Sequence, residues 1–174
     1  MKVVLVFVST LNGKITRGDD PEVRTWSSVS DKKHYRRIWK NSNLVVMGSS
    51  TYTQNIIRPS KSRLIVVMTS RPELYSSRNI EGQLEFTSEL PGQIVKRFSA
   101  SGTKLMTVVG GSKIASSFLK ASLVDELVLT IEPLIFGKGI NLFYEDDFEV
   151  KLKLVDITRA NEDGTLITVY KIKK

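Results

Sequence analysis

The stretch VVGGSKIASSFL, residues 108–119, joins a short apolar run to a pattern with helical spacing. Two adjacent glycines, Gly110 and Gly111, stand at the junction, although glycine loses more backbone entropy on folding than any other residue. The start of a helix that follows a strand presents unpaired N–H groups and the positive end of the helix dipole, which together favour phosphate. A tight connection or close helix packing explains the pair equally well, so these residues alone leave both interpretations open.

The apolar runs on both sides of this junction in the sequence predict the fold class. Five of them are continuous, as strands buried on both faces require, and they cover residues 3–8, 44–47, 64–68, 105–109 and 127–131. Helical spacing between them predicts helices at 30–41, 93–99 and 112–121. Strands that alternate with helices favour an α/β fold with a mainly parallel central sheet and helices on both faces.

The end of the chain has a different pattern. Residues 151–159 and 165–173 approach the alternation of half-buried strands, and they flank the turn-forming sequence ANEDG. They predict an antiparallel hairpin that completes the sheet. A length of 174 residues suits one domain with a sizeable core, so we expect a single domain over residues 1–174.

Composition limits the classes of partner and site. A net charge of +8 indicates an anionic partner, and the densest cluster, KKHYRR at 32–37, is typical of a solvated helix face. No reading helix, finger or stacking motif accompanies it, which disfavours nucleic acid. With no cysteine and one histidine, we expect no metal site and a protein compatible with the reducing cytoplasm. No apolar run is long enough to cross a membrane.

Two common nucleotide motifs do not match the glycine pair. GGSK lacks the spacing and the following hydroxyl residue of a P-loop. It also lacks the G-x-G-x-x-G spacing and early position of a Rossmann fingerprint, although Glu132 follows about twenty residues later, as that motif requires.

The order of several segments resembles the dihydrofolate-reductase-like superfamily. They are TLNGKIT at 10–16, Trp26, NLVVMGSSTY at 43–52, LIVVMTSR at 64–71, the glycine pair, and LVDELVLTIEPLIFGKG at 123–139. The similarity is closest to the C-terminal reductase domain of the bifunctional riboflavin-biosynthesis deaminase/reductase. The resemblance implies a three-layer fold that binds NADPH along the carboxyl edge of the sheet.

The resemblance also implies positions for the cofactor. Those expected to contact NADPH are Gly110, Gly111, Ser112, Lys113 and Ile114 at the diphosphate, Ser49, Ser50 and Thr51 after the second strand, Thr69, Ser70 and Arg71 at the 2′-phosphate, Val8, Ile15 and Thr16 at the nicotinamide, and Trp26 near cofactor or substrate. Read alone, Trp26 is typical of a core residue and Arg71 of a surface loop.

The implied reaction is hydride transfer to a heterocycle such as 5-amino-6-(5-phosphoribosylamino)uracil, with Arg24 and Asp31 expected to bind the substrate. The resemblance does not identify a catalytic acid or base. Asp31 stands where dihydrofolate reductases place their pterin-binding carboxylate, but SVSD at 28–31 also resembles a capping box, and this structural interpretation is favoured. His34, one turn later, could face a phosphate, but a surface position beside Lys and Arg is favoured.

Three departures weaken the substrate assignment more than the cofactor assignment. Val109 replaces a common glutamate, LNG replaces LDG at 11–13, and the loop after Thr51 is short and basic. The alternatives are a dihydrofolate or pterin reductase and a non-catalytic nucleotide- or nucleic-acid-binding protein. Related reductases suggest a homodimer, to which the apolar residues 123–136 could contribute.

Overall fold

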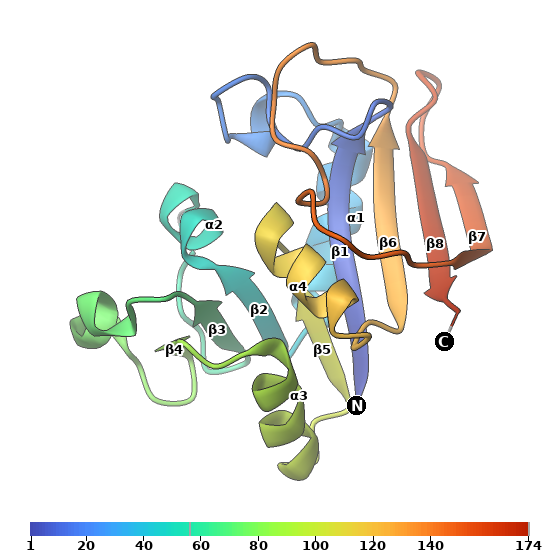
Figure 1. Cartoon of the computed structure of the whole chain (residues 1–174). Coiled ribbons are helices and arrows are strands. Elements are labelled where there is room, and N and C mark those ends of the chain that lie inside the picture. Colours follow the sequence, from blue (N-terminus) through green and yellow to red (C-terminus); the bar gives the residue numbers. More distant parts are fainter. Residues whose placement is uncertain (56, 174) are drawn as a thin grey trace.

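The chain folds around one eight-stranded sheet with strand order β4-β3-β2-β5-β1-β6-β8-β7 (Figure 1). The computed structural model describes residues 1–55 and 57–173. The strands from β4 to β6 are parallel, and β8 is antiparallel to both β6 and β7. This confirms the mainly parallel sheet and the C-terminal hairpin. The strands are β1 (Lys2–Thr10), β2 (Leu44–Gly48), β3 (Leu64–Met68), β4 (Leu84–Thr87), β5 (Leu105–Val108), β6 (Glu126–Glu132), β7 (Leu152–Arg159) and β8 (Leu166–Ile172).

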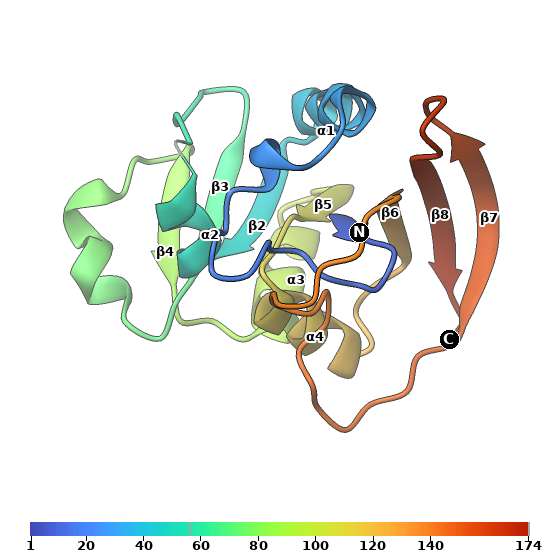
Figure 2. The ribbon, with the colours of Figure 1, turned by 90° about the horizontal axis from the view of Figure 1, so that it is seen from above.

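Helices lie on both faces of the sheet, as predicted. Helix α1 (Val29–Asn41) covers one face, and α3 (Pro91–Ala100) and α4 (Ser112–Lys120) lie on the other (Figure 2). A short helix, α2 (Ser49–Gln54), directly follows β2. Two 3₁₀ segments, η1 (Val23–Thr25) and η2 (Pro72–Arg78), lie within the connections.

Two apolar clusters hold these layers together. In the larger one, Phe118 of α4 and Ile94 of α3 are fully buried against side chains such as Leu5 and Val108 from β1 and β5. The smaller cluster is centred on β2, β3 and β4, where Trp39 of α1 and Tyr52 of α2 pack against it. Continuous apolar strands such as β2 are therefore buried on both faces.

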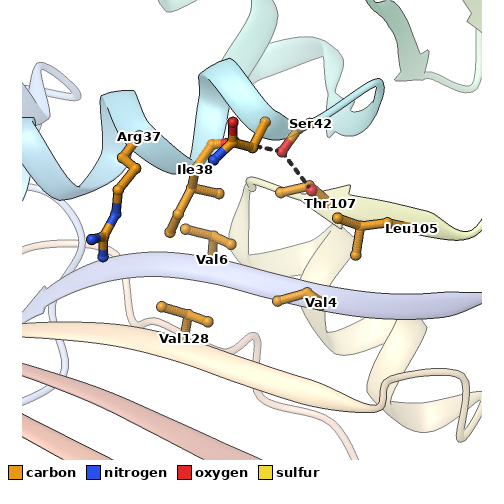
Figure 3. Close-up of a pocket in the computed structure, with 9 residues that line it drawn as sticks. Val4, Val6, Arg37, Ile38, Ser42, Leu105, Thr107 and Val128 are labelled. Carbon is orange, nitrogen blue, oxygen red and sulfur yellow. Dashed lines mark hydrogen bonds between the residues drawn. The ribbon is translucent and has the colours of Figure 1, made fainter.

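The C-terminal half of α1 is fixed to the sheet by a few specific contacts. Figure 3 shows Ile38 above Val6 and a hydrogen bond of 2.8 Å between the Ser42 and Thr107 hydroxyls. These contacts leave a small cavity of about 210 Å³ between α1 and strands β1, β5 and β6. The buried Arg63 donates from Nε to the Ser42 carbonyl at 2.8 Å, which is a second contact that fixes the end of the helix.

Two strands differ from the sequence-based expectation. β4 was not predicted, because LEFT is only four residues long and alternates in burial. β6 was expected to be buried on both faces, but Val128, Leu129 and Ile131 are half-exposed. The cause is its place in the sheet, since β6 borders the parallel strand β1 on one side only and the antiparallel hairpin on the other.

The loop after β6 is fixed to the loop after β1 by a close approach at Gly139. A Cβ atom built on Gly139 would lie 2.1 Å from the Thr16 carbonyl oxygen, and its φ of +146° lies in a region that side chains rarely adopt. Nearby, Ile140 N–H donates to the Thr16 hydroxyl at 2.8 Å and Ile15 N–H to the Ile140 carbonyl at 2.9 Å.

We predict that Gly139→Ala lowers the free energy of unfolding by about 2 kcal/mol or more. The added methyl group would clash with the main-chain carbonyl of Thr16, which can be relieved only by a shift of the backbone. Gly137→Ala is the matched control, since nothing lies within 4 Å of its Cβ position. Urea denaturation compares the two, and equal stability of both variants would contradict the prediction.

Candidate functional site

A cavity of about 1330 Å³ runs along the carboxyl edge of the sheet, where the parallel strands end. The strand ends that reach it include Val8 of β1, Gly48 of β2 and Thr130 of β6. Fifteen of the seventeen predicted site residues line this one cavity. They are Val8, Ile15, Thr16, Arg24, Asp31, Ser49, Ser50, Thr51, Thr69, Ser70, Gly110, Gly111, Ser112, Lys113 and Ile114.

The loops after β2 and β5 meet in the wall of the cavity at the glycine pair. Gly48 N–H donates to the Gly110 carbonyl at 2.9 Å, and the Gly110–Gly111 peptide is cis. A Cβ atom at Gly110 or Gly111 would lie 3.3 or 3.4 Å from the Thr51 hydroxyl oxygen. At Gly110 the φ of +132° also favours glycine. The glycine pair thus lets the two loops approach each other and leaves main chain at the cavity surface.

The start of α4 contributes a hydroxyl donor that no other described residue uses. Its N-cap residue, Gly111, provides no side-chain cap. The next residue, Ser112, is 7% exposed, lines the cavity, and has a buried hydroxyl without a hydrogen-bond partner among the described residues. A buried polar atom without a partner costs about 1–3 kcal/mol. An acceptor oxygen of a bound ligand would satisfy the hydroxyl and the first N–H groups of the helix together.

Cations outnumber carboxylates in the cavity wall. The lining includes Arg24, Lys32, Arg36, Arg58 and Lys113, against the carboxylates Asp31 and Glu89. Only Arg24 among these cations forms an ion pair within residues 1–55 and 57–173. Glu89 is neutralised by Arg97, 2.6 Å away. The wall therefore favours an anionic ligand.

A buried polar layer supports the cavity beneath the start of α1. The Glu132 carboxylate accepts the Ser28 N–H at 2.8 Å and the Thr165 hydroxyl at 2.6 Å, which ties β6 to α1 and to the tip of the hairpin. Ser30 donates to the Ala160 carbonyl at 3.1 Å on the same tip. The N-terminus of α1 is thus positioned by residues more than a hundred positions later in the sequence.

Asp31 lies in this layer and faces the cavity with only 6% of its surface exposed. Burial raises the pKa of its carboxyl group, and the nearby charge of Glu132 raises it further, while hydrogen bonds from Thr130 and Ser27 oppose the shift. The Ser28 hydroxyl accepts the Asp31 N–H at 3.1 Å, so one half of the predicted capping box is present, but the Ser28 N–H donates to Glu132 instead of to Asp31. The capping role and a role in the cavity are compatible, because the first uses the backbone of Asp31 and the second uses its side chain.

Two predicted residues are not part of the cavity wall. Trp26 is buried behind it, edge-on to Phe136 with ring centroids 5.4 Å apart, and its indole N–H has no partner in the described part of the chain. Arg71 is exposed at the start of η2, and its N–H donates to the Thr69 hydroxyl at 3.2 Å. Arg24 does line the cavity, but Glu22 pairs with its guanidinium, and this contact lowers the pKa of Glu22 to about 2.

The sequence analysis missed several residues of the wall. Arg58 and Tyr144 belong to loops with no periodic pattern, and the ring of Tyr144 lies 5.0 Å from the Lys113 ammonium group. The prediction of a surface position for His34 is wrong, since His34 is half-buried and lines the cavity. The helical spacing of Asp31, His34 and Tyr35 was a usable signal, because residues three and four apart share a helix face.

Within residues 1–55 and 57–173, no group of three or more histidine, aspartate or glutamate side chains is placed to hold a metal ion. No helix in that part of the chain has the length and hydropathy needed to span a bilayer.

Comparisons with known proteins agree with this architecture. The chain is 26% identical over 163 residues to the protein YwjB of Bacillus subtilis, with 88% of each chain covered. A crystal structure of a pyrimidine reductase-like protein from Corynebacterium diphtheriae has a TM-score of 0.78 at 17% identity, covering 99% of this chain and 92% of that one.

A larger protein contains the same fold as one of its parts. The diaminohydroxyphosphoribosylaminopyrimidine deaminase/5-amino-6-(5-phosphoribosylamino)uracil reductase of Thermotoga maritima has a TM-score of 0.77 at 18% identity. The match covers 99% of this chain and 56% of that protein. Because residues 1–166 match the family described as the RibD C-terminal domain, the chain belongs to that family, whose reductase-like fold the structure shares.

Proposed function

We propose that the protein is an NADPH-dependent reductase of the riboflavin-biosynthesis type, which acts on 5-amino-6-(5-phosphoribosylamino)uracil or a related heterocycle. The observation that carries the proposal is the buried Ser112 hydroxyl without a partner, beside the bare main chain of Gly110 and Gly111 in an electropositive cavity. Family membership supports the same reaction class. We propose further that the protein works in the cytoplasm.

The residues of the cavity fit an elongated dinucleotide with three phosphate groups. Gly110, Gly111, Ser112, Lys113 and Ile114 would hold the diphosphate at the N-terminus of α4, with help from the hydroxyl-bearing residues 49–51. Thr69 and Ser70 would meet the 2′-phosphate, and the exposed guanidinium of Arg71 would approach it from the solvent side. Val8, Ile15 and Thr16 would border the nicotinamide. Trp26, behind the wall, would support this end of the cavity.

When bound, NADPH supplies the hydride, so the protein must align the substrate, exclude water and provide a proton. Asp31 is the acid in the wall whose protonated form is favoured, because burial and Glu132 raise the pKa of its carboxyl group. We therefore propose Asp31 as the proton donor and as a substrate contact. Arg24 would contact a substrate phosphate only as part of its pair with Glu22.

A pterin or dihydrofolate reductase is the second candidate, and the buried Asp31 in the cavity favours it. NADPH oxidation, followed by absorbance with a pyrimidine or with dihydrofolate, separates the two enzymes. A non-catalytic nucleotide- or nucleic-acid-binding protein would show no turnover with either substrate, and binding to polynucleotides would weaken steeply with salt.

We predict that NADPH at about a hundred times its dissociation constant adds about 2.7 kcal/mol of stability, or roughly 5–10 °C in melting temperature. NADH should give a smaller shift, because it lacks the 2′-phosphate. In Arg71→Gln the two shifts should become similar, while Arg78→Gln, an exposed arginine at the other end of η2, should keep the preference. Equal shifts in the unmodified protein would contradict the 2′-phosphate assignment, and no shift would contradict the proposed function.

Asp31→Asn should lower turnover by roughly 10²-fold or more while it stabilises the protein at high pH. The folded-state pKa of Asp31 is raised, so its contribution to stability is present at low pH and is lost as pH rises through that pKa. The stability difference, variant minus unmodified protein, should therefore increase between pH 4 and pH 8. Urea denaturation at several pH values measures this difference, and a constant value would contradict the burial argument. The exposed Asp147→Asn is the control for turnover.

We also propose that the protein is a homodimer, and the surface we expect to form the interface is β7. All eight residues of β7 are exposed, and the strand forms one edge of the sheet. Leu152, Leu154, Val155 and Ile157 are 41–53% exposed, and an uncovered apolar edge strand invites pairing. The region 123–136 suggested by the sequence is a poorer surface, because β6 lies inside the sheet between β1 and β8.

Light scattering after size exclusion should give a mass of about twice 19.6 kDa for the unmodified protein. Leu154→Lys should give the single-chain mass. Leu74→Lys, which changes a 61%-exposed leucine on η2, should leave the dimer intact. A dimer that persists in Leu154→Lys would contradict the assignment of the interface to β7.

A further inference from the structure

The one histidine of the chain is part of the cavity wall. His34 lies one helical turn after Asp31 on α1, and both residues line the same cavity. Side chains three residues apart on a helix are neighbours, with Cβ atoms about 5–6 Å apart. The carboxyl group and the imidazole therefore belong to neighbouring parts of the cavity wall.

Arg37 determines which ring nitrogen of His34 carries the proton. Its Nη2 atom lies 3.2 Å from His34 Nδ1, and because a guanidinium group can only donate, Nδ1 must accept. In the neutral imidazole the proton is then on Nε2. Burial, together with the positive charge of Arg37, lowers the pKa of His34 and favours this neutral form.

The resulting Nε2–H group is a donor without an acceptor. It is shielded from solvent and has no hydrogen-bond partner among the described residues. Since a buried N–H group without a partner is costly, such groups in native proteins call for a specific explanation. His34 itself lines the cavity, so a movement of its imidazole towards a bound ligand would give Nε2–H an acceptor. The exposed side chain of Arg37 can follow that movement.

We propose that His34 is a substrate-contacting hydrogen-bond donor that, together with Asp31, selects a ring with adjacent N–H and carbonyl groups, a lactam edge. The ring carbonyl oxygen accepts from His34 Nε2–H, and the ring N–H donates to an Asp31 carboxyl oxygen. This inference rests on the proposed function, because it assigns substrate contacts within the same cavity. It adds that a ring with amino groups in place of its carbonyl groups is discriminated against at His34.

Nitrogen NMR shows directly which ring nitrogen of His34 carries the proton. The chain has one histidine, so protein labelled with ¹⁵N-histidine gives signals from that residue only. At neutral pH the free protein should show a protonated Nε2 and an unprotonated Nδ1. Arg37→Gln should weaken this preference, while Lys40→Gln removes an equal charge from the same helix and should not. Arg37 borders the small cavity in Figure 3, so the change removes no residue from the wall of the large cavity and acts on the site through His34. A proton on Nδ1 of the free protein would overturn the proposal.

Two pyrimidines test the ligand class in the presence of NADPH. The probe 5,6-diaminouracil carries the lactam edge, and 2,4,5,6-tetraaminopyrimidine has the same ring with amino groups in place of the carbonyl groups. The unmodified protein should prefer the first by roughly tenfold, the effect of about one well-made buried hydrogen bond. His34→Phe should reduce this preference, because only the Asp31 contact remains, and His34→Gln, which keeps a donor, should recover part of it. The exposed Lys33→Gln is the control.

Saturation with 5,6-diaminouracil should also shift the Nε2 signal of the labelled histidine. An unchanged preference in His34→Phe, an unchanged Nε2 signal, or failure of both pyrimidines to bind to the NADPH-loaded protein would overturn the assignment to His34. These outcomes differ from failure of the proposed function, in which NADPH itself gives no thermal shift in the unmodified protein.

Discussion

The site depends on one close contact, that between the loop after β2 and the loop after β5. The Gly48 N–H to Gly110 carbonyl bond joins the loops, and the Thr51 hydroxyl lies 3.3 and 3.4 Å from the positions that Cβ atoms would take on Gly110 and Gly111. A side chain at Gly110 would be both strained and in contact with Thr51, so the pair keeps main chain at the cavity surface. The same contact directs the start of α4 and its Ser112 hydroxyl towards the ligand space.

The opposite wall of the cavity depends on long-range contacts instead. Glu132 joins the start of α1 to the hairpin tip, so the C-terminal hairpin completes the sheet and also fixes the position of Asp31. An exposed apolar β7 on the same hairpin means that a partner subunit covering it would also support this wall. In the proposed dimer, the interface and the environment of the proposed acid would therefore be connected through the hairpin.

The parts of the structure that the sequence predicts are those with strong local patterns. The apolar runs of β1, β2, β3 and β5 predict their strands. The glycine pair and the order of the segments predict most of the residues that line the cavity. The four-residue β4 and the partly exposed β6 differ from the sequence-based expectation. Burial in these strands depends on neighbouring elements, which a local sequence pattern does not reveal. His34 was assigned to the surface because Lys and Arg residues flank it in KKHYRR, whereas in the structure His34 lines the large cavity and its neighbour Arg37 borders the small one. Trp26 lies behind the wall for a similar reason, its contact with Phe136 being set by a loop distant in sequence.

The most direct test follows the glycine N–H signals during titration with NADPH. The chain has eleven glycines, so protein labelled with ¹⁵N-glycine gives a simple spectrum, in which Gly110 and Gly111 are identified by substitution. The account predicts that these two signals shift on binding while those of Gly102 and Gly164, which line no part of the cavity, stay in place. Unchanged signals from Gly110 and Gly111 in protein saturated with NADPH would contradict it.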